Sequence, residues 1–453
     1  MSRSPAALMD AHFQDVTDLL CRLVAFPTVQ GEAEPGCPFG RPVAQALDLM
    51  LREGERLGFR TACLDHKAGY IELGEGDDYV MMVAHLDVVP AGDGWTRPPF
   101  APTREGQRLY GRGTGDNKCA AAAGLYALLA LRESGLPLTK RVRLVLGCDE
   151  ETGMTDLEHY FSREPLPVFG FIPDSDYPIV NREKGIVSAT FACPRPADGL
   201  LADLGGGAAA NVVPPSAFAL LPICRLPHDA LARLGRCSQV SLTQEDGLLR
   251  VTAQGRAAHA CHPQQGDNAL TRLARVLLQA DLPFAPQEQA FLQFLQDGLS
   301  PTDGSGLGIN GGDEYGELTC NLGLAHTEKD GFYALVNLRY PVTWQGEDLR
   351  RTLETQGTAA QARLLSFDDM PPLNVSGENP YVRKLQQVYT ARTGKPAELL
   401  CIGGGTYARA CRGRCVGFGV CGHTEHMPDE FIDLDELRAH AQMMAEALAA
   451  IAL

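Results

Sequence analysis

The sequence predicts a layered α/β fold with a mostly parallel sheet, interrupted by an inserted α+β domain. Three observations support this prediction. Short apolar runs alternate with helical periodicity over the first 185 residues, as they do when helices join parallel strands. The pattern changes near residue 186 and returns near residue 375. The length of 453 residues suits two or three domains at about 100–200 residues each.

The first segment is expected to supply most of the parallel sheet. Continuous apolar runs of a few residues are typical of strands buried on both faces. Such runs predict strands at 79–84, 141–147 and 168–172. Apolar residues at helical spacing predict helices over 10–26, 41–58, 117–133 and 155–161.

The predicted insert covers residues 186–374 and mixes strands with helices. It is expected to contain a glycine-rich loop at 205–207, helices near 266–280 and 286–297, and paired strands at 317–325 and 331–340. The first domain then resumes. Its last part should contain a helix beginning near Asn379, strands around 398–402 and 415–418, and an amphipathic helix at 433–452.

Composition and charge exclude several classes of protein. Hydrophobic residues make up 45% and charged residues 21%, which fits neither global disorder nor a fibrous repeat. The sequence has 40 Lys and Arg residues and 56 Asp and Glu residues, which gives a net charge of −16. Such a surface repels phosphate backbones and anionic lipid, so nucleic acid and membranes are not expected partners. No apolar run reaches the ~18 residues of a membrane span.

The cysteines favour a reducing compartment. The fourteen cysteines are scattered singly and form no C-x-x-C pair, so a disulfide framework or a structural zinc knuckle is not expected. The first apolar stretch, 16–26, is interrupted by Asp18 and Arg22 and does not have the form of a secretion signal. The expected location is therefore cytoplasmic.

Polar side chains collect where the predicted strands end, and open α/β sheets bind ligands there. His85 and Asp87 follow the strand at 79–84, and their spacing of two places both side chains on one face. A metal-binding histidine usually donates its second ring N–H to a carboxylate or carbonyl, which is a role for Asp87. A structural His–Asp pair is an equally common interpretation of this pattern.

Three further clusters carry carboxylates or histidines. Asp116 follows a glycine-rich turn at a predicted helix start, where Asp is also a common N-cap. Glu150 and Glu151 end a hydrophobic strand, where paired carboxylates are costly unless a cation neutralises them. The remaining candidates are Asp174 and Asp176 after the next strand and His423 and His426 far downstream.

The order and spacing of these clusters resemble the co-catalytic metallopeptidases related to carboxypeptidase G, aminoacylase and succinyl-diaminopimelate desuccinylase. Among them the chain is most similar to the PepV-type dipeptidases, and the resemblance covers nearly the whole chain. Its motifs are F-P-T (26–28), H-L-D-V-V-P-x-G-D-G-W (85–95), G-R-G-T-x-D (111–116), D-E-E (149–151), P-D-x-x-Y-P (173–178), I-G-G-G-T-Y-A-R (402–409) and H-M-P-D-E (426–430).

The resemblance implies a site for two divalent cations. His85 and Asp174 would hold one cation, Glu151 and His426 the other, and Asp116 would bridge both. Glu150 would be the general base, and Asp87 would orient His85. Two histidines and three carboxylates suit zinc, with manganese or cobalt as alternatives. On spacing alone, Asp176 and His423 remain alternatives to Asp174 and His426.

Motifs in the insert and in the glycine run resemble parts of the family that hold substrate. N-V-V-P (211–214), G-R-A-A-H (255–259) and N-L-R-Y-P (337–341) resemble lid motifs. They imply that Asn211 and His259 reach the scissile carbonyl and that Arg339 holds a substrate carboxylate with its planar guanidinium. The run Gly403, Gly404, Gly405 and Thr406 can present main-chain N–H groups to an anion. A nucleotide phosphate loop is disfavoured, because the run does not have the glycine and lysine spacing of such a loop.

The expected activity is hydrolysis of dipeptides with a free N-terminal amine and a free C-terminal carboxylate, by a metal-bridging water that Glu150 activates. Residues 1–185 and 375–453 would form a discontinuous catalytic domain and residues 186–374 its lid. The alternative is an N-acyl amino acid amidohydrolase with the same metal centre. A scaffold with a decayed site is disfavoured, because all five metal ligands and Glu150 are present. The expected partner is a small peptide, and the expected state is a monomer or homodimer.

Overall fold

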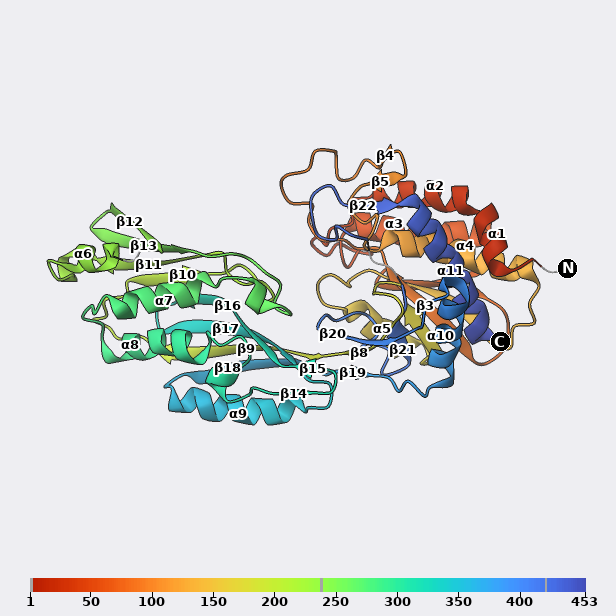
Figure 1. Cartoon of the computed structure of the whole chain (residues 1–453). Coiled ribbons are helices and arrows are strands. Elements are labelled where there is room, and N and C mark those ends of the chain that lie inside the picture. Colours follow the sequence, from red (N-terminus) through yellow and green to blue (C-terminus); the bar gives the residue numbers. More distant parts are fainter. Residues whose placement is uncertain (1–2, 237–238, 420–421) are drawn as a thin grey trace. The chain divides into compact units, whose positions relative to one another are not determined.

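The computed structural model describes residues 3–236, 239–419 and 422–453, and its chain divides into two compact units (Figure 1). Unit 1 comprises Met1–Arg182 and Leu373–Leu453, and unit 2 comprises Glu183–Pro372. The sequence placed these divisions after residues 185 and 374. Each unit has a hydrophobic core of its own.

Unit 1 contains a nine-stranded sheet whose centre is parallel. The strand order is β1-β2-β6-β3-β7-β21-β8-β19, with β20 also paired to β8. The pairs β3·β6, β3·β7 and β7·β21 are parallel, whereas β1·β2, β2·β6 and β8·β21 are antiparallel. The strands are β1 (Arg60–Leu64), β2 (Ala68–Leu73), β3 (Tyr79–His85), β6 (Arg141–Gly147), β7 (Phe169–Ile172), β8 (Ile179–Glu183), β19 (Leu373–Asn374), β20 (Leu399–Ile402) and β21 (Cys415–Gly417).

The parallel strands are buried because helices cover the sheet. Every residue of β3 is buried, as are α4 residues on all sides of that alanine-rich helix; α4 packs against α1, α2 and α11 as well as against β2, β3 and β6 (Figure 1). The helices of unit 1 are α1 (Pro5–Ala11), α2 (Phe13–Val24), α3 (Arg41–Arg56), α4 (Lys118–Ser134), α5 (Thr155–Arg163), α10 (Pro380–Thr393) and α11 (Leu434–Ala452). A three-stranded sheet adds β4 (Thr103–Glu105), β5 (Arg108–Tyr110) and β22 (Phe431–Asp433).

Local signals explain where several helices begin. The Asn379 side chain accepts a hydrogen bond from the Tyr381 N–H at the start of α10, and the Asp433 side chain accepts from the first turn of α11. Asn and Asp are favoured N-caps because they satisfy amide groups that lack a helical partner. The layered α/β fold predicted from the sequence is confirmed. The single helix expected over 10–26 is two helices, divided at His12.

Unit 2 is built on an eight-stranded antiparallel sheet with the order β12-β13-β11-β10-β16-β17-β9-β18. Helix α7 packs against β10, β11, β13 and β16, and α9 packs against β9 and β18 (Figure 1). The strands are β9 (Gly185–Pro194), β10 (Asp203–Gly206), β11 (Ser216–Pro222), β12 (Val240–Glu245), β13 (Leu248–Gln254), β16 (Thr319–Thr327), β17 (Gly331–Tyr340) and β18 (Arg363–Met370); β14 (Gly312–Asp313) and β15 (Gly316–Glu317) form a separate pair. The helices are α6 (Ala230–Gly235), α7 (Ala269–Gln279), α8 (Pro286–Gln293), the π-helical turn η3 (Phe294–Gly298) and α9 (Gly346–Ala359), with short 3₁₀ turns η1 (Ile223–Arg225), η2 (Pro263–Gln265) and η4 (Ser305–Leu307).

The glycine-rich loop expected at 205–207 is wrong for its first two residues. Gly205 and Gly206 lie in β10 and pair with β11 and β16. A Cβ on Gly205 would lie 2.9 Å from the Phe218 ring, and one on Gly206 would lie 2.8 Å from Leu270 of α7. These glycines therefore permit close packing within the sheet and under a helix.

Two further findings concern the described part of the chain. None of its helices combines the length and the apolarity that crossing a membrane requires. Its cysteines are free thiols.

Candidate metal centre

Two overlapping groups of potential metal ligands lie in unit 1. His85, Asp116 and Asp174 form the first group, and Asp116, Glu151 and His426 form the second. Within each group the ligand atoms all lie within 4.8 Å of one another. Three of the five residues come from parallel strands, because His85 ends β3 and Glu151 and Asp174 closely follow β6 and β7. The parallel centre of the sheet thus brings distant parts of the sequence to one edge.

Asp116 connects the two groups. Its Oδ1 lies 3.0 Å from His85 Nε2, and its Oδ2 lies 3.0 Å from His426 Nε2. Asp174 Oδ2 is 3.4 Å from His85 Nε2, and Glu151 Oε2 is 3.2 Å from His426 Nε2. Each oxygen of Asp116 therefore faces a different histidine, an arrangement suited to a carboxylate shared by two cations.

His85 is oriented through its other ring nitrogen. Nδ1 lies 3.0 Å from the main-chain oxygen of Asp87 and 3.5 Å from its Oδ1. Donation from Nδ1–H to that carbonyl leaves the Nε2 lone pair for a metal. The Asp87 carboxylate also accepts a hydrogen bond of 3.0 Å from the Glu151 N–H. Asp87 consequently links the end of β3 to the turn that carries Glu150 and Glu151.

The charges of this cluster shift several pKa values. Burial alone would raise the pKa of Asp116, but hydrogen bonds to His426 and His85 outweigh burial and hold that pKa well below its usual range. Hydrogen bonds to Asp116 and Glu151 raise the pKa of His426 to about 10. Burial, reinforced by the charges of Asp174 and Glu151, raises the pKa of Glu150 well above its usual range. Carboxylates at this density favour positive charge at the site.

A buried carboxylate holds the loop that presents Asp116. Glu430 Oε1 accepts hydrogen bonds from the main-chain N–H groups of Gly113 (3.0 Å), Gly115 (2.9 Å) and Asp116 (3.2 Å). Its Oε2 pairs with Arg112 Nη1 at 2.6 Å, and both side chains are buried. Because His426 lies four residues before Glu430, one short segment supplies a candidate ligand and fixes another. Sequence reasoning gave Glu430 no role, although it ends the H-M-P-D-E motif.

A second buried carboxylate holds the turn that carries Glu150. Asp156 Oδ2 accepts hydrogen bonds from the N–H groups of Cys148 (2.6 Å) and Asp149 (3.0 Å), and from the Tyr407 hydroxyl. The Tyr407 ring packs edge-on against the His85 ring. Sequence reasoning missed Asp156 because an acid in the first turn of a predicted helix is ordinary.

One pocket of about 380 Å³ is lined by four of the five ligand candidates. Besides the ligand candidates Asp116, Glu151, Asp174 and His426, its lining includes Glu150, Asp176, Gly404, Gly405, Thr406 and Glu425. The structure thus brings most of the predicted glycine run to the metal cluster, although Gly403 is not among the lining residues. His423 lies in neither ligand group and pairs with Glu436 at 2.9 Å.

The pocket also holds two carboxylates without an assigned partner. Asp176 is exposed and makes no hydrogen bond or ion pair with the described residues. Glu425 is half-buried, and its Oε1 is buried without a hydrogen-bond partner in the described part of the chain. Sequence reasoning missed Glu425, whose neighbours His423 and His426 carried the stronger signal.

The three predicted substrate residues of the insert lie on neighbouring segments of unit 2. Val212 forms an isolated β-bridge with His259, and the Ala260 N–H donates to the Asn211 carbonyl at 2.9 Å. Arg339 pairs across the sheet with Thr319, whose hydroxyl donates to the Ala260 carbonyl at 3.3 Å. Asn211 and His259 are exposed, whereas Arg339 is buried and its Nε donates to Asn337 Oδ1 at 3.0 Å.

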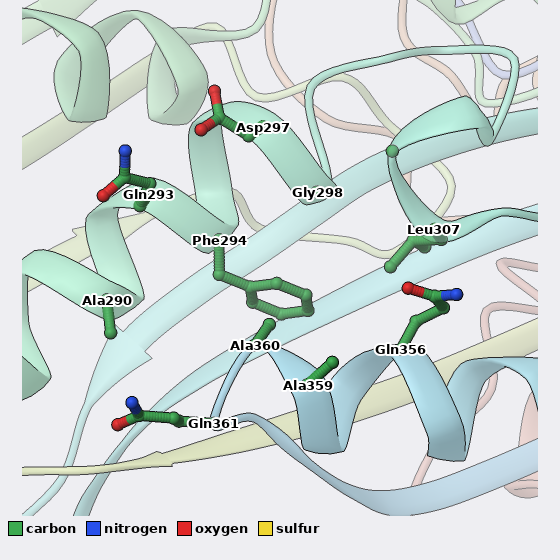
Figure 2. A pocket seen from close by; sticks show the side chains of 11 residues that line it. Ala290, Gln293, Phe294, Asp297, Gly298, Leu307, Gln356, Ala359, Ala360 and Gln361 are labelled. Atoms are coloured by element: carbon green, nitrogen blue, oxygen red, sulfur yellow. The ribbon is translucent and has the colours of Figure 1, made fainter.

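Unit 2 also has a pocket of about 410 Å³ that contains none of the predicted residues. Figure 2 shows this pocket between the α8–η3 segment and α9, with the Phe294 ring beside Ala359 and Ala360. Asp297 is its one charged lining residue among the residues that the structure describes. Asp297 belongs to neither of the ligand groups found among the described residues.

Comparisons with known proteins agree with the motifs. The sequence pattern of peptidase family M20/M25/M40 matches residues 81–450. A Bacillus subtilis (strain 168) protein named "Putative dipeptidase YtjP" is 39% identical over 434 residues, which cover 92% of each chain. The Beta-Ala-Xaa dipeptidase of Lactobacillus delbrueckii subsp. lactis is 33% identical over 434 residues, covering 91% of this chain and 90% of that protein.

The fold is shared with solved structures of low sequence identity. Human carnosine dipeptidase 1 superposes with a TM-score of 0.61 at 14% identity, covering 99% of this chain and 98% of that one. At this identity the likeness concerns the fold alone.

Proposed function

The chain belongs to peptidase family M20/M25/M40 and is therefore a metallopeptidase, and on this premise we propose that it hydrolyses dipeptides with a free N-terminal amine and a free C-terminal carboxylate. The resemblance to this family expected from the motifs is confirmed. The names of the relatives at 39% and 33% identity support the dipeptide as substrate. The observation that carries the proposal is the pair of ligand groups joined by Asp116, with Glu150 in the same pocket.

The donor set fits two divalent cations. Each group offers one imidazole nitrogen and carboxylate oxygens, a combination that suits zinc and tolerates manganese or cobalt. The buried Glu151 Oε1 has no hydrogen-bond partner among the described residues, and a buried carboxylate oxygen needs a donor or a cation. We assign His85 and Asp174 to one cation, Glu151 and His426 to the other, and Asp116 to both. Bound cations would polarise the peptide carbonyl and lower the pKa of water toward about 7.

Glu150 is the general base of the proposed reaction. Its carboxylate takes a proton from the attacking water and later delivers that proton to the departing amine nitrogen. Its burial in a cluster of carboxylates favours proton uptake. Asp87 keeps His85 in the orientation that ligation requires and anchors the Glu151 main chain. These roles supply both the proton transfer and the geometry of the cleaving step.

The remaining predicted residues hold the substrate. We assign stabilisation of the carbonyl oxygen to His259 and Asn211, and the terminal carboxylate to Arg339 together with the main-chain N–H groups of Gly403, Gly404, Gly405 and Thr406. The Cys261 N–H lies 3.3 Å from His259 Nδ1. The same Nδ1 lies 2.6 Å from the Cys261 Sγ. Acceptance of the Cys261 N–H at Nδ1 would leave the ring proton on Nε2, the tautomer that can donate to an oxyanion.

The test is a hydrolysis screen of the metal-reconstituted enzyme. We expect unblocked dipeptides to be cleaved at least about a hundredfold faster, by kcat/KM, than N-acetyl amino acids or tripeptides. Comparable rates on N-acetylated substrates would replace the dipeptidase assignment with an N-acyl amino acid amidohydrolase.

The free thiols of the described cysteines support a reducing location such as the cytoplasm.

A further inference from the structure

We infer that the Glu425 carboxylate binds the α-ammonium group of the substrate. The inference rests on the proposed dipeptidase function, since that function requires an anionic group for the free amine and the sequence motifs assign none. It adds a specificity residue to the pocket without altering the metal ligands or the base.

Four of the six pocket carboxylates have an assigned partner or role. Asp116, Asp174 and Glu151 belong to the two ligand groups and face histidine nitrogens. Glu150 is placed beside them by the turn that Asp156 holds. Two carboxylates lining the same pocket remain, Asp176 and Glu425.

Burial distinguishes these two carboxylates. Asp176 is exposed, so water can satisfy both of its oxygens. Glu425 is half-buried, and its Oε1 is shielded from solvent without a hydrogen-bond donor in the described parts of the chain. A carboxylate oxygen in that condition costs free energy until a donor reaches it. An ammonium group brings positive charge and three N–H donors, and a hydrogen bond between two charged groups is a strong one.

The chain places Glu425 close to the reaction. It directly precedes His426, whose Nε2 contacts Asp116 and Glu151, so the residue is anchored to the second ligand group. On its other side Gly422 also lines the pocket, and a Cβ there would lie 3.5 Å from Glu425 Oε1. A larger residue at 422 would thus add atoms beside the oxygen that is to receive the amine.

The experiment compares two substrates that share one scissile bond. Alanyl-alanine has the α-amine, whereas propionyl-alanine carries hydrogen in its place. Wild type, Glu425→Gln and Asp176→Asn are assayed as full-length, metal-reconstituted enzymes, with metal content measured for each. Asp176→Asn is the matched control because it removes the same charge from the same pocket.

We expect Glu425→Gln to lower kcat/KM for alanyl-alanine by about 10- to 100-fold, mainly through KM, because the amine loses a charged hydrogen bond. Its activity on propionyl-alanine and its metal content should stay at the wild-type level. Asp176→Asn should preserve the preference for the free amine. Glu425→Asp, which keeps the charge on a shorter chain, should recover part of the loss.

Each other outcome overturns the assignment in a distinguishable way. An equal loss on both substrates would make Glu425 a general electrostatic or structural group. Loss of metal from Glu425→Gln would make it a ligand, and loss of the preference in Asp176→Asn alone would move the amine to Asp176. A wild type that preferred alanyl-alanine while Glu425→Gln kept that preference would refute Glu425 and spare the dipeptidase. A wild type without any preference would refute the dipeptidase function itself.

Discussion

Asp116 is the residue on which both ligand groups depend, because each of its oxygens faces a different histidine at 3.0 Å. Glu150 lies in the same pocket but in neither group. Asp116 belongs to both ligand groups and Glu150 to neither. We therefore expect substitution of Asp116 to change the metal content and substitution of Glu150 to leave it unchanged.

Asp116→Ala should empty both cation sites, whereas Glu150→Ala should retain both cations. Glu150→Ala should nevertheless reduce kcat by about 10²–10⁴-fold, the usual contribution of general acid–base catalysis. Elemental analysis of the purified variants and steady-state kinetics check both expectations. Two retained ions in Asp116→Ala would contradict the bridge, and loss of ions from Glu150→Ala would make that residue a ligand.

His440 gives a pH-dependent contribution to stability. Burial lowers its pKa from 6.5 to about 4, and its Nδ1 lies 2.9 Å from the Tyr177 hydroxyl. The unfolded chain therefore binds a proton that the folded chain does not, so this contribution is present above pH 6.5 and is lost as the pH falls toward 4. The slope approaches about 1.4 kcal/mol per pH unit.

His440→Gln should remove this part of the acid sensitivity, since glutamine does not titrate but still offers an acceptor to Tyr177. Urea unfolding at several pH values between 4 and 7 measures the effect. An unchanged slope in the variant would show that other groups cause the acid sensitivity.

The loop before α4 is fixed by a residue far along the chain. Three main-chain N–H groups of this loop donate to Glu430, and Arg112 pairs with the same carboxylate. The loop carries no regular secondary structure of its own that would hold Asp116. Its conformation therefore depends on the segment that also carries His426.

Glu430→Gln should weaken cation binding by about 10–100-fold, the usual cost of losing a group that orients a metal ligand. Competition with a chromogenic chelator measures the affinity directly and does not require activity. Glu436→Gln is the control, because Glu436 is exposed and pairs with His423. Equal cation affinities in wild type and Glu430→Gln would show that cation binding does not depend on the hydrogen bonds between Glu430 and this loop.

The sequence predicts long, continuous elements well and short or isolated ones poorly. Strand β6 coincides with the predicted 141–147, and α11 with the predicted 433–452 to within one residue at its start. The end of β6 is a continuous apolar run, and the apolar residues of α11 recur at helical spacing. Strands β4 and β5 have three residues each, too few to show a period. Gly205 and Gly206 suggested a loop because consecutive glycines are typical of loops. Their packing against Phe218 and Leu270 could not be predicted, since only the folded chain brings those residues near.

The candidate site shows the same division. His85, Glu151 and Asp174 follow strands that could be predicted, so their proximity could be inferred from the sheet. Glu430 and Asp156 act through main-chain N–H groups of other segments. No local pattern reveals such partners, because any acid near a turn looks alike in the sequence.

The predicted residues divide between two units with separate cores. The ligand candidates and Glu150 belong to unit 1, and Asn211, His259 and Arg339 belong to unit 2. The proposed reaction therefore uses both units, and a substitution in unit 2 tests that requirement without touching the metal ligands.

Arg339→Ala should reduce kcat/KM for free-acid dipeptides by at least about thirtyfold, since truncating a buried charge pair costs several kcal/mol. C-terminal amides of the same dipeptides lack the charge and should lose far less. Arg339→Lys keeps the charge but not the planar guanidinium, so its kcat/KM for free-acid dipeptides should lie between the values of wild type and Arg339→Ala. An equal loss on acids and amides would show that Arg339 has a structural role.

Two strands of one sheet carry the chain out of unit 1 and back into it. The chain leaves unit 1 along β8 and returns along β19, and these strands are neighbours in one sheet. Asn181 and Val375 join them, through the Val375 N–H to the Asn181 carbonyl at 2.9 Å and the Asn181 amide to the Val375 carbonyl at 2.6 Å. Unit 2 is thus inserted between two neighbouring strands of the unit 1 sheet.

Two strands that are already neighbours in a sheet can be joined by a short connection. Replacing residues 184–371 with an Asn-Gly turn should therefore yield a shortened protein that unfolds in one cooperative thermal transition and still binds both cations. Circular dichroism and metal analysis would test this, and a chain that failed to fold would show that unit 1 requires the insert. If the shortened chain folds, unit 1 does not need unit 2 for its stability. Another domain could then be inserted in place of unit 2 while unit 1 keeps both cation sites.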